Sequence, residues 1–318
     1  MNERELQGRV ARLHYQHGLT HQEVGDLLGL SRIKVTRLLA AARDNGVVEI
    51  RVHTTSRPFH ELETALVRRF GLQQAWVAPS CRDGERERNA VGSTGAQALE
   101  AVVPRSGTVA VGLSSSVATV VPHIHVPPRP ELGFVPLAGS WGGVSRGMNP
   151  HELALRFGTA FGARTYHLPA PILAATAEAA AAFRADPSVR DAERRAAGAD
   201  VLVAGVGGIE QSSGMMIDAL SEDDRRRLDT GAAVGDISAR YFDRDGRPVR
   251  GGLDDRVVGM DLERMIGVPH RIAVSYGAHK ARPLAVALQH GLMNMVVTDV
   301  DTARAMLDAD AGNERRSG

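Results

Sequence analysis

The sequence predicts an α/β protein of two domains: a small N-terminal helix-turn-helix domain of the winged type in residues 1–55 and a larger α/β domain in residues 56–318. Near the N-terminus, apolar residues recur at helical spacing in two short stretches joined by a glycine turn. Further along, continuous apolar runs alternate with helical periods, which is typical of a mostly parallel sheet covered on both faces. The segment Thr54–Pro58 interrupts both patterns and marks the domain boundary.

The first helix of the helix-turn-helix is expected to begin after Thr20. Glu23 follows Thr20 at the spacing of a capping box, and Gly29 is positioned to end the helix. Gly25 lies inside this helix, where glycine costs about 1 kcal/mol relative to alanine. We expect that its missing side chain lets the second helix approach closely.

The second helix has the features of a recognition helix. Ser31 can cap it, and Val35, Leu38 and Leu39 give it one buried face. Its outward face is basic, and the run from Gly29 to Arg43 contains no carboxylate. Such a helix fits the major groove of DNA, with its N-terminal residues on base edges and its cations on phosphates. The residues expected to contact DNA are Thr20, Ser31, Arg32, Lys34, Thr36 and Arg37.

A basic helix can also be the solvated face of an unrelated helical subdomain. The agreement of capping residues, turn glycine and buried spacing favours DNA binding over that alternative. After the recognition helix, Asn45 and Gly46 predict a turn. The apolar residues of 47–52 predict an extended segment like the wing that often follows such helices.

The charge of the chain is nearly balanced, with 38 basic and 37 acidic residues. The net charge of the whole chain therefore does not attract it to polyanions such as DNA. The basic character is local, because residues 1–55 hold eight arginines and lysines against six carboxylates. This modest excess predicts weak DNA binding per chain. We therefore expect a homo-oligomer, a dimer or a tetramer, that binds double-stranded operator DNA through several copies.

The composition argues against several classes of protein. Cys81 is the only cysteine, so neither an intrachain disulfide nor a thiolate metal cluster is expected. The N-terminus is charged and lacks the apolar core of a signal peptide, and no apolar run is long enough to cross a bilayer. The sequence therefore predicts a cytoplasmic protein that has no membrane partner and needs neither a cofactor nor a metal.

The larger domain is expected to contain helices over Phe59–Phe70, His151–Phe161 and Pro283–His290, and an alanine-rich helix that ends near Leu99. Apolar runs predict buried strands at seven places, which are Gln74–Ala78, Thr108–Gly112, Leu132–Leu137, Thr165–Leu168, Val201–Val206, Ile272–Ser275 and Met295–Thr298. In such folds ligands bind where the carboxyl ends of the strands meet loops and helix N-termini.

Four loops at strand ends are candidates for a ligand site. The first, Gly112–Ser116, leads from a strand into a helix and can offer amides and hydroxyls to a phosphate or a sugar oxygen. The second, Ala138–Asn149, is rich in glycine. The third, Gly205–Gly208, lacks the spacing of a dinucleotide fingerprint or a Walker loop. Taken alone, each of these loops is more often an ordinary turn.

The fourth loop, Ser275–Lys280, places a lysine beside a helix N-terminus. Because that end of a helix already favours anions, a second positive group there is useful when a phosphate is bound. Asp236, in a strand-entry position, can accept hydrogen bonds from sugar hydroxyls, or it could simply cap a turn. The residues expected to bind an effector are Gly112, Ser114, Ser116, Asn149, Asp236, Gly277 and Lys280.

Other patterns indicate no further site. His14, His17 and His21 could meet at a helix start, but no acidic or cysteine partner completes a metal site. Asp243 and Asp245 are spaced as at the start of a calcium loop, yet the glutamate expected at its end is missing, so a hairpin turn is preferred. No Ser-His-Asp or paired-carboxylate arrangement is evident, and we assign no catalytic residue.

Four stretches give the chain a family resemblance over nearly its whole length. They are the opening segment Gly18–Ile50, MNPHELALRFGTAFGARTYHLPAPIL, GAAVGDISARYFDRDGRPV and the stretch ending in VVTDVDTARAML. The chain resembles the SorC family of sugar-responsive bacterial transcription regulators. The resemblance implies an N-terminal helix-turn-helix, an effector domain related to sugar-phosphate isomerases, and an oligomer whose operator affinity is set by a sugar, polyol or sugar-phosphate effector.

By this resemblance, Ser114, Ser116, Asp236 and Lys280 match ligand-contacting positions of the family. At Ser275–Gly277, where members often have a small residue and two glycines, the bulk of Tyr276 is expected to reshape the pocket. The leading interpretation is a DNA-binding regulator controlled by its effector. The competing one is a sugar-phosphate isomerase or deaminase that carries a DNA-binding domain. Against the enzyme, the sequence offers no general base that can be placed beside a sugar.

Overall fold

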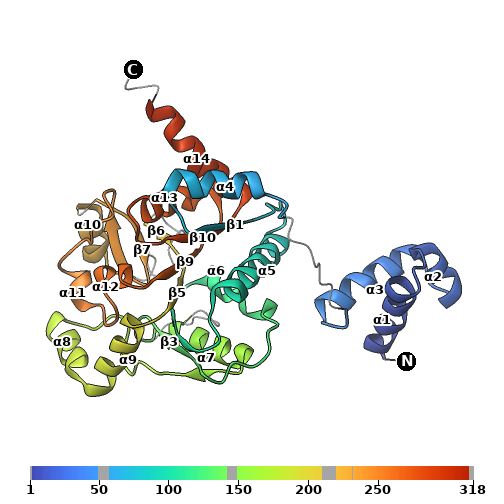
Figure 1. Ribbon diagram of the computed structural model, residues 1–318, viewed down its shortest axis with the longest axis horizontal. Helices are drawn as coiled ribbons and strands as arrows, with labels where there is room; N and C mark the ends of the chain where they lie inside the picture. The colour runs from blue at the N-terminus through green and yellow to red at the C-terminus, as the bar shows by residue number, and fades with distance from the viewer. Residues whose placement is uncertain (1, 49–56, 142–148, 210–219, 231, 315–318) are drawn as a thin grey trace. The chain divides into compact units, whose positions relative to one another are not determined.

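The computed structural model describes residues 2–48, 57–141, 149–209, 220–230 and 232–314 (Figure 1). The chain divides into two compact units, Met1–Arg57 and Pro58–Gly318. Apolar side chains form a separate core within each unit. Each unit is therefore stabilised by contacts of its own.

Helices build the N-terminal unit. α1 (Glu3–Ala11) continues into a π-helical turn at Arg12–Gln16, and α2 (His21–Leu28) and α3 (Arg32–Asp44) follow. These helices share one core, whose buried members are Val10, Ala11, Val24, Val35, Leu38, Leu39 and Ala42. The two helices that the apolar spacing predicts are confirmed as α2 and α3.

The caps of α2 and α3 are those that the sequence predicts. The Thr20 hydroxyl accepts a hydrogen bond from the Glu23 amide, and the Glu23 carboxylate accepts one from the Thr20 amide at 2.8 Å. Gly29 ends α2 in the left-handed region, with a φ of 65°. Ser31 caps α3 by accepting a hydrogen bond from the Lys34 amide at 3.2 Å. Local sequence thus sets where α2 ends and where α3 begins.

The predicted wing after α3 lies mostly outside the described residues, which stop at Val48 on this side. Val47 and Val48 themselves are not in a strand. Their amides donate to the Ala42 carbonyl at 2.8 and 2.9 Å, and both residues pack against the core of the N-terminal unit. These two residues therefore close the C-terminal end of α3.

The sequence suggests that Gly25 lets the second helix approach α2 closely. In the structure, the closest backbone to Gly25 is mainly that of the turn after α2. A Cβ on Gly25 would lie 2.5 Å from the carbonyl oxygen of Leu30. The Leu30 amide in turn donates to the Gly25 carbonyl at 2.8 Å. The backbones of α2 and of the turn therefore leave no room for a side chain at this position.

A Gly25→Ala variant is expected to destabilise the N-terminal unit by about 2 kcal/mol, because the turn backbone must shift to admit the methyl group. Faster hydrogen–deuterium exchange of the amides of residues 20–44 would report this loss. Gly8→Ala is the matched control. Gly8 lies within α1, and the atom nearest to an added Cβ is 3.9 Å away, so alanine should leave exchange unchanged or slower. Equal exchange in the two variants would contradict the prediction.

The larger unit is built on a seven-stranded parallel sheet with the strand order β1-β10-β9-β5-β2-β3-β4, which confirms the predicted sheet. β1 and β10, which come first and last in the sequence, are neighbours, with Gln74 opposite Met295 and Ala78 opposite Asp299. The strands are β1 (Gln74–Ala78), β2 (Gly107–Val111), β3 (Leu132–Pro136), β4 (Arg164–Thr165), β5 (Val201–Ala204), β9 (His270–Val274) and β10 (Met295–Asp299). Only β4 is much shorter than predicted.

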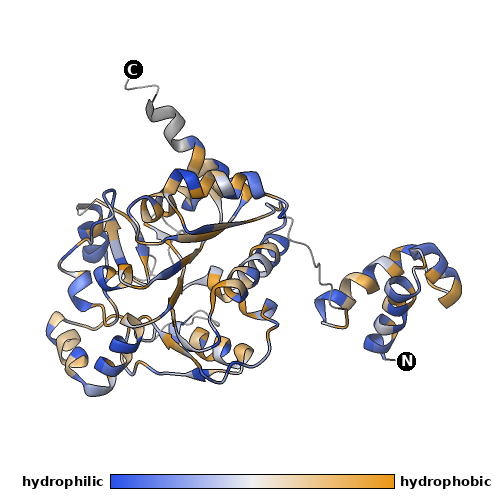
Figure 2. Cartoon of the chain, in the orientation of Figure 1, coloured by the Kyte–Doolittle hydropathy of each residue, from blue (hydrophilic) through white to orange (hydrophobic). Residues whose placement is uncertain are grey.

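Helices cover both faces of this sheet (Figure 1). One face is packed by α4 (His60–Phe70), α8 (Ala177–Ala185), α9 (Pro187–Ala197), α12 (Leu262–Ile266), α13 (Ala281–Gln289) and α14 (Val300–Glu314). The other face is packed by α5 (Gly84–Val102), α6 (Ser115–Ala118) and α7 (Pro150–Phe161). Hydrophilic and hydrophobic residues mix along these helices (Figure 2), and no helix in the described part of the chain is long and apolar enough to cross a membrane.

The sequence does not predict a second sheet, yet the larger unit contains one. It is antiparallel and consists of β6 (Gly207–Gly208), β7 (Ala233–Ile237) and β8 (Arg240–Asp243). Asp236 lies inside β7, opposite Tyr241, and not at a strand entry. α10 (Glu222–Thr230) and α11 (Leu253–Arg256) pack against this sheet. Its strands are short and contain glycine and charged residues, so they show no periodic apolar pattern.

The residues after β8 form the hairpin turn that the sequence prefers over a calcium loop. The Asp243 amide donates to the Arg247 carbonyl at 2.9 Å. The Asp243 carboxylate accepts hydrogen bonds from the amides of Asp245 and Arg247, both at 2.9 Å. This carboxylate therefore stabilises its own turn.

Candidate functional site

α3 presents a basic surface formed by Arg32, Lys34 and Arg37. All three residues are exposed, whereas Val35, Leu38 and Leu39 of the same helix are buried in the core. α3 carries no carboxylate before Asp44, so no acidic neighbour on the same helix offsets these cations. This geometry can bind the phosphates of a nucleic acid.

The hydroxyl residues predicted to contact DNA already make hydrogen bonds within the N-terminal unit. Thr20 and Ser31 cap α2 and α3. The Thr36 hydroxyl donates to the Arg32 carbonyl at 3.0 Å, and its oxygen lies 3.0 Å from Nδ1 of His21. These hydroxyls therefore position the two helices, and the contact between His21 and Thr36 is one that sequence reasoning missed.

In the larger unit, the loops after β2 and β5 meet at the carboxyl edge of the parallel sheet. Ser114 follows β2 and packs against Gly205, where an added Cβ would lie 2.3 Å from the Ser114 hydroxyl oxygen. That oxygen also accepts a hydrogen bond from the Val117 amide at 3.1 Å and so caps α6. Ser114 and Ser116 are only 6% and 2% exposed. The loop after β2 is therefore held firmly by its neighbours.

The turn between β7 and β8 lies against this loop. Its residues Ser238 and Ala239 have φ values of 52° and 69°, a conformation that is uncommon for residues with a side chain. The Ser238 hydroxyl accepts a hydrogen bond from the Leu113 amide at 3.0 Å, and a Cβ on Gly112 would lie 2.5 Å from the same oxygen. The loop after β2 thus helps to hold a strained turn. Nothing in the sequence reveals it, because neither turn residue is glycine or asparagine.

Asp236 on β7 belongs to the same cluster. Its carboxylate accepts a hydrogen bond from the Ala239 amide at 3.0 Å, which is the turn-capping alternative that the sequence allows. Burial raises the pKa of Asp236 from its ordinary 3.8 to about 6, although the Ala239 amide and the Lys280 ammonium both act to lower it. Burial lowers the pKa of Lys280, and the Asp236 carboxylate acts to raise it. Asp236 and Lys280 therefore form an interacting pair of opposite charge in a partly buried place.

The loop that carries Lys280 is anchored by Asp299, a residue that sequence reasoning missed. Gly277 turns the chain with a φ of 95° and donates its amide to the Asp299 carboxylate at 2.9 Å. Lys280 then stands directly before α13, at the helix N-terminus as the sequence predicts, without a side-chain hydrogen bond to the helix. The hydroxyls of Ser80 and Thr302 also donate to Asp299. Burial acts to raise the pKa of Asp299, but these hydrogen bonds lower it overall. The available signal was an aspartate directly after the strand predicted over Met295–Thr298.

Comparison with known proteins decides the family. Residues 57–308 match the model of the Sugar-bind family, described as "Putative sugar-binding domain". Transcriptional regulator LsrR of Klebsiella pneumoniae subsp. pneumoniae is 31% identical over 96% of this chain and 93% of its own length. Transcriptional regulator LsrR of Enterobacter sp. (strain 638) is 30% identical over 96% of this chain and 94% of its own length. This chain belongs to the SorC family of sugar-responsive, DNA-binding transcriptional regulators.

Solved structures show the same fold. The full-length sorbitol operon regulator SorC from Klebsiella pneumoniae has a TM-score of 0.77 at 21% identity and covers 96% of this chain and 99% of its own. A transcriptional regulator from Streptococcus pneumoniae TIGR4 has a TM-score of 0.74 at 22% identity and covers 79% of this chain and 97% of its own. The predicted fold class and the resemblance to the SorC family are confirmed.

Asn149 stands apart from the other effector residues predicted for this SorC-family chain. It caps α7 through a hydrogen bond from the His151 amide at 3.2 Å, and its side-chain amide donates to the Trp141 carbonyl at 3.2 Å. The described contacts link the loop of Gly112 and Ser114 to the turn between β7 and β8. They link Asp236 to the same turn and to Lys280. They do not bring Asn149 into that group.

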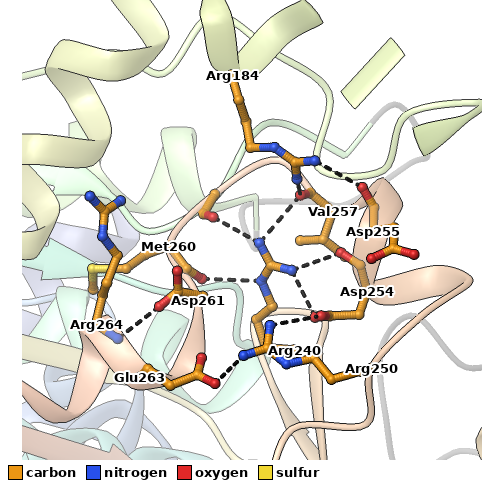
Figure 3. Close-up of polar contacts among 11 residues, drawn as sticks. Arg184, Arg240, Arg250, Asp254, Asp255, Val257, Met260, Asp261, Glu263 and Arg264 are labelled. Carbon is orange, nitrogen blue, oxygen red and sulfur yellow. Dashed lines mark hydrogen bonds and ion pairs between the residues drawn. The ribbon is translucent and has the colours of Figure 1, made fainter. Parts of the chain in front are cut away.

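A buried arginine on β8 stabilises the larger unit of this SorC-family regulator (Figure 3). Arg240 directly follows the strained turn and is only 5% exposed. Its guanidinium pairs with the Asp254 carboxylate at 2.8 Å. It also donates to four main-chain carbonyls, those of Asp254, Val257, Gly259 and Met260.

The segment 254–260, whose carbonyls Arg240 binds, packs against the residues that follow β3. The Met260 amide donates to the Leu137 carbonyl at 2.9 Å. A Cβ on Gly259 would lie 2.6 Å from Cα of Ala138, so this glycine is needed for the close approach. Arg240 thereby ties the small sheet to the end of β3, where the predicted loop Ala138–Asn149 begins.

Proposed function

We propose that this protein binds operator DNA through α3 and that a sugar, polyol or sugar phosphate bound in the larger unit sets the affinity. The observation that carries the proposal is the exposed surface of Arg32, Lys34 and Arg37, on a helix with no carboxylate before Asp44, in a chain that also holds a sugar-binding domain. We assign DNA binding to residues 1–55 and effector binding to residues 56–318. Because operator DNA lies in the bacterial cytoplasm, the protein acts there.

The effector site of this proposal is the carboxyl edge of the parallel sheet. Lys280 stands at the N-terminus of α13, so an anionic group of the effector is attracted by both the ammonium and the helix end. Asp236 can accept hydrogen bonds from sugar hydroxyls. The loops of Gly112–Ser116 and Gly277 border the site, although the amides of Gly112, Leu113 and Gly277 already donate to other groups of the protein. We assign Asn149 to the effector from its place at the N-terminus of α7, although no described contact links it to the other residues.

Control of DNA affinity requires coupling between the two units. We propose a homo-oligomer, a dimer or a tetramer, whose subunit arrangement depends on the effector and determines how well paired α3 helices fit an operator. Relatives named transcriptional regulator LsrR and sorbitol operon regulator SorC support a regulatory role. Coupling of this kind is typically about 5- to 150-fold in affinity.

Titration of fluorescent DNA with the full-length protein tests this proposal. Duplexes would first be selected from a random pool by the wild-type protein, and binding would then be measured with and without a panel of sugars, polyols and sugar phosphates. At least one compound is expected to change the affinity by about 5- to 150-fold. Unchanged curves across the panel would contradict effector control.

Two variants report on the DNA surface in the same titration. Arg37→Ala is expected to weaken binding to every duplex. It should also reduce the slope of log affinity against log salt by about 1 for each chain that contacts the DNA, because one phosphate per chain is no longer neutralised. Arg194→Ala is the control, because Arg194 is an arginine of α9 whose side chain is 73% exposed. Equal affinities of the two variants would remove Arg37 from the DNA contact surface.

One observation favours the competing enzyme hypothesis. A carboxyl group whose pKa is raised to about 6 next to a lysine is a usable acid–base pair, and the sequence alone does not place such a pair. We propose that the protein is not an enzyme, since its relatives are named regulators. NMR of sugar phosphates incubated with the protein would distinguish the two hypotheses, because isomerised or deaminated product would favour the enzyme.

A further inference from the structure

Ile33 is the most exposed large apolar residue in the described part of the chain. It lies in the first turn of α3, between Arg32 and Lys34, and is 74% exposed. Val35, two residues on and therefore about 200° around the helix, is fully buried in the core. Ile33 thus points away from the core of its unit and outward with the basic surface.

The surroundings of Ile33 restrict what can cover it. A partner that covers this side chain must also accept the charges of Arg32 and Lys34, which no carboxylate on α3 offsets before Asp44. Duplex DNA meets both requirements, because its phosphates are anionic and its major groove displays one apolar group, the C5-methyl of thymine. The N-terminal residues of a recognition helix are those that reach base edges.

We propose that Ile33 is a specificity-determining residue that contacts the C5-methyl group of a thymine in each half-site of the operator. This inference rests on the proposed function, because it requires α3 to enter the major groove. It adds a base-reading contact that charge does not provide. The arginines and the lysine of this surface attract any DNA, whereas an apolar contact with a methyl group distinguishes thymine from the other bases.

Deoxyuridine substitution tests the contact directly, because deoxyuridine differs from thymidine only in lacking the C5-methyl group. Using full-length protein and a duplex selected from a random pool, each thymine in turn would be replaced by deoxyuridine. With the wild-type protein, one position per half-site is expected to lose about fourfold in affinity, the effect of one buried methyl-sized group. With Ile33→Ala, that position is expected to bind thymine and deoxyuridine equally.

Leu27→Ala is the matched control. Leu27 is a second exposed apolar residue of the same unit, 65% exposed on α2, but it lies next to Asp26 and not on the basic surface. This variant should keep the wild-type penalty for deoxyuridine. Since alanine favours helices and Ile33 makes no core contact, Ile33→Ala is expected to stay folded, which circular dichroism would verify.

The outcomes separate this inference from the proposed function. Failure to select any preferred duplex would overturn DNA recognition itself. Selective binding with no position sensitive to deoxyuridine, or with a penalty that persists in Ile33→Ala, would overturn the role of Ile33 alone. A change of oligomeric state in Ile33→Ala with thymine preference intact would show that a second copy of the chain covers this residue, and would also overturn the inference.

Discussion

An Arg240→Met variant is expected to lose about 3–5 kcal/mol of unfolding free energy in the larger unit. The substitution keeps an unbranched apolar stem but removes every donor of the guanidinium. Among the described residues, the Asp254 carboxylate then keeps an ion pair with Arg250 alone, at 3.4 Å and on an exposed side chain. Four carbonyls also lose a hydrogen bond in a place where water is largely excluded.

Tryptophan fluorescence during urea unfolding measures this loss, because Trp76 and Trp141 are the only tryptophans and both lie in the larger unit. Arg194→Met serves as the control. Arg194 pairs with Asp191 at 3.2 Å on the surface of α9, so its loss should cost less than about 1 kcal/mol. Similar midpoints for the two variants would show that the Arg240 network does not hold the fold together.

An Asp236→Asn variant is expected to be more stable than the wild type at pH 7.5, by about 3 kcal/mol. The pKa of Asp236 is raised from 3.8 to about 6 in the folded protein, so ionisation is less favourable there than in the unfolded chain. A difference of about two pKa units corresponds to about 3 kcal/mol. This penalty is fully present above pH 6, declines as the pH falls toward 4, and vanishes when the group is protonated in both states.

Denaturation from pH 4 to pH 8 checks this prediction. Asparagine stays neutral, so the stability difference between variant and wild type should grow between pH 4 and pH 6 and then level off. Asp308→Asn is the control, because Asp308 is an exposed carboxyl on α14. A constant difference across this pH range would show that Asp236 is not the titrating group.

The elements that depend on local sequence are predictable. The apolar run that follows Gln74 predicts β1 at its observed residues, and the capping residues of α2 and α3 occupy the places that the sequence predicts. The strand predicted over Thr165–Leu168 is wrong in its length. The observed β4 ends at Thr165, and the residues after it leave the sheet although they include buried apolar ones. Leu168 packs into the core from a loop. Apolar residues in the sequence therefore predict burial, but they do not show which of the buried residues pair with a neighbouring strand.

Much of the candidate site depends on contacts between distant segments. Chemistry singles out Asp236 and Lys280 separately, but only the fold shows that they interact. The positive φ values of Ser238 and Ala239 and the hydrogen bonds from Arg240 to main-chain carbonyls arise from packing that no local pattern encodes. The roles of these residues toward an effector stay predictions.

The pairing of β1 with β10 has a consequence for how the chain folds during its synthesis on the ribosome. The partner of β1 lies about 220 residues further along, so this strand emerges early and waits unpaired. At about 5–20 residues per second, the wait lasts on the order of ten to forty seconds. The N-terminal unit closes its own core within its first 48 residues and needs no such delay. A nascent chain can therefore complete the core of its N-terminal unit, α3 included, well before the larger unit can complete its parallel sheet.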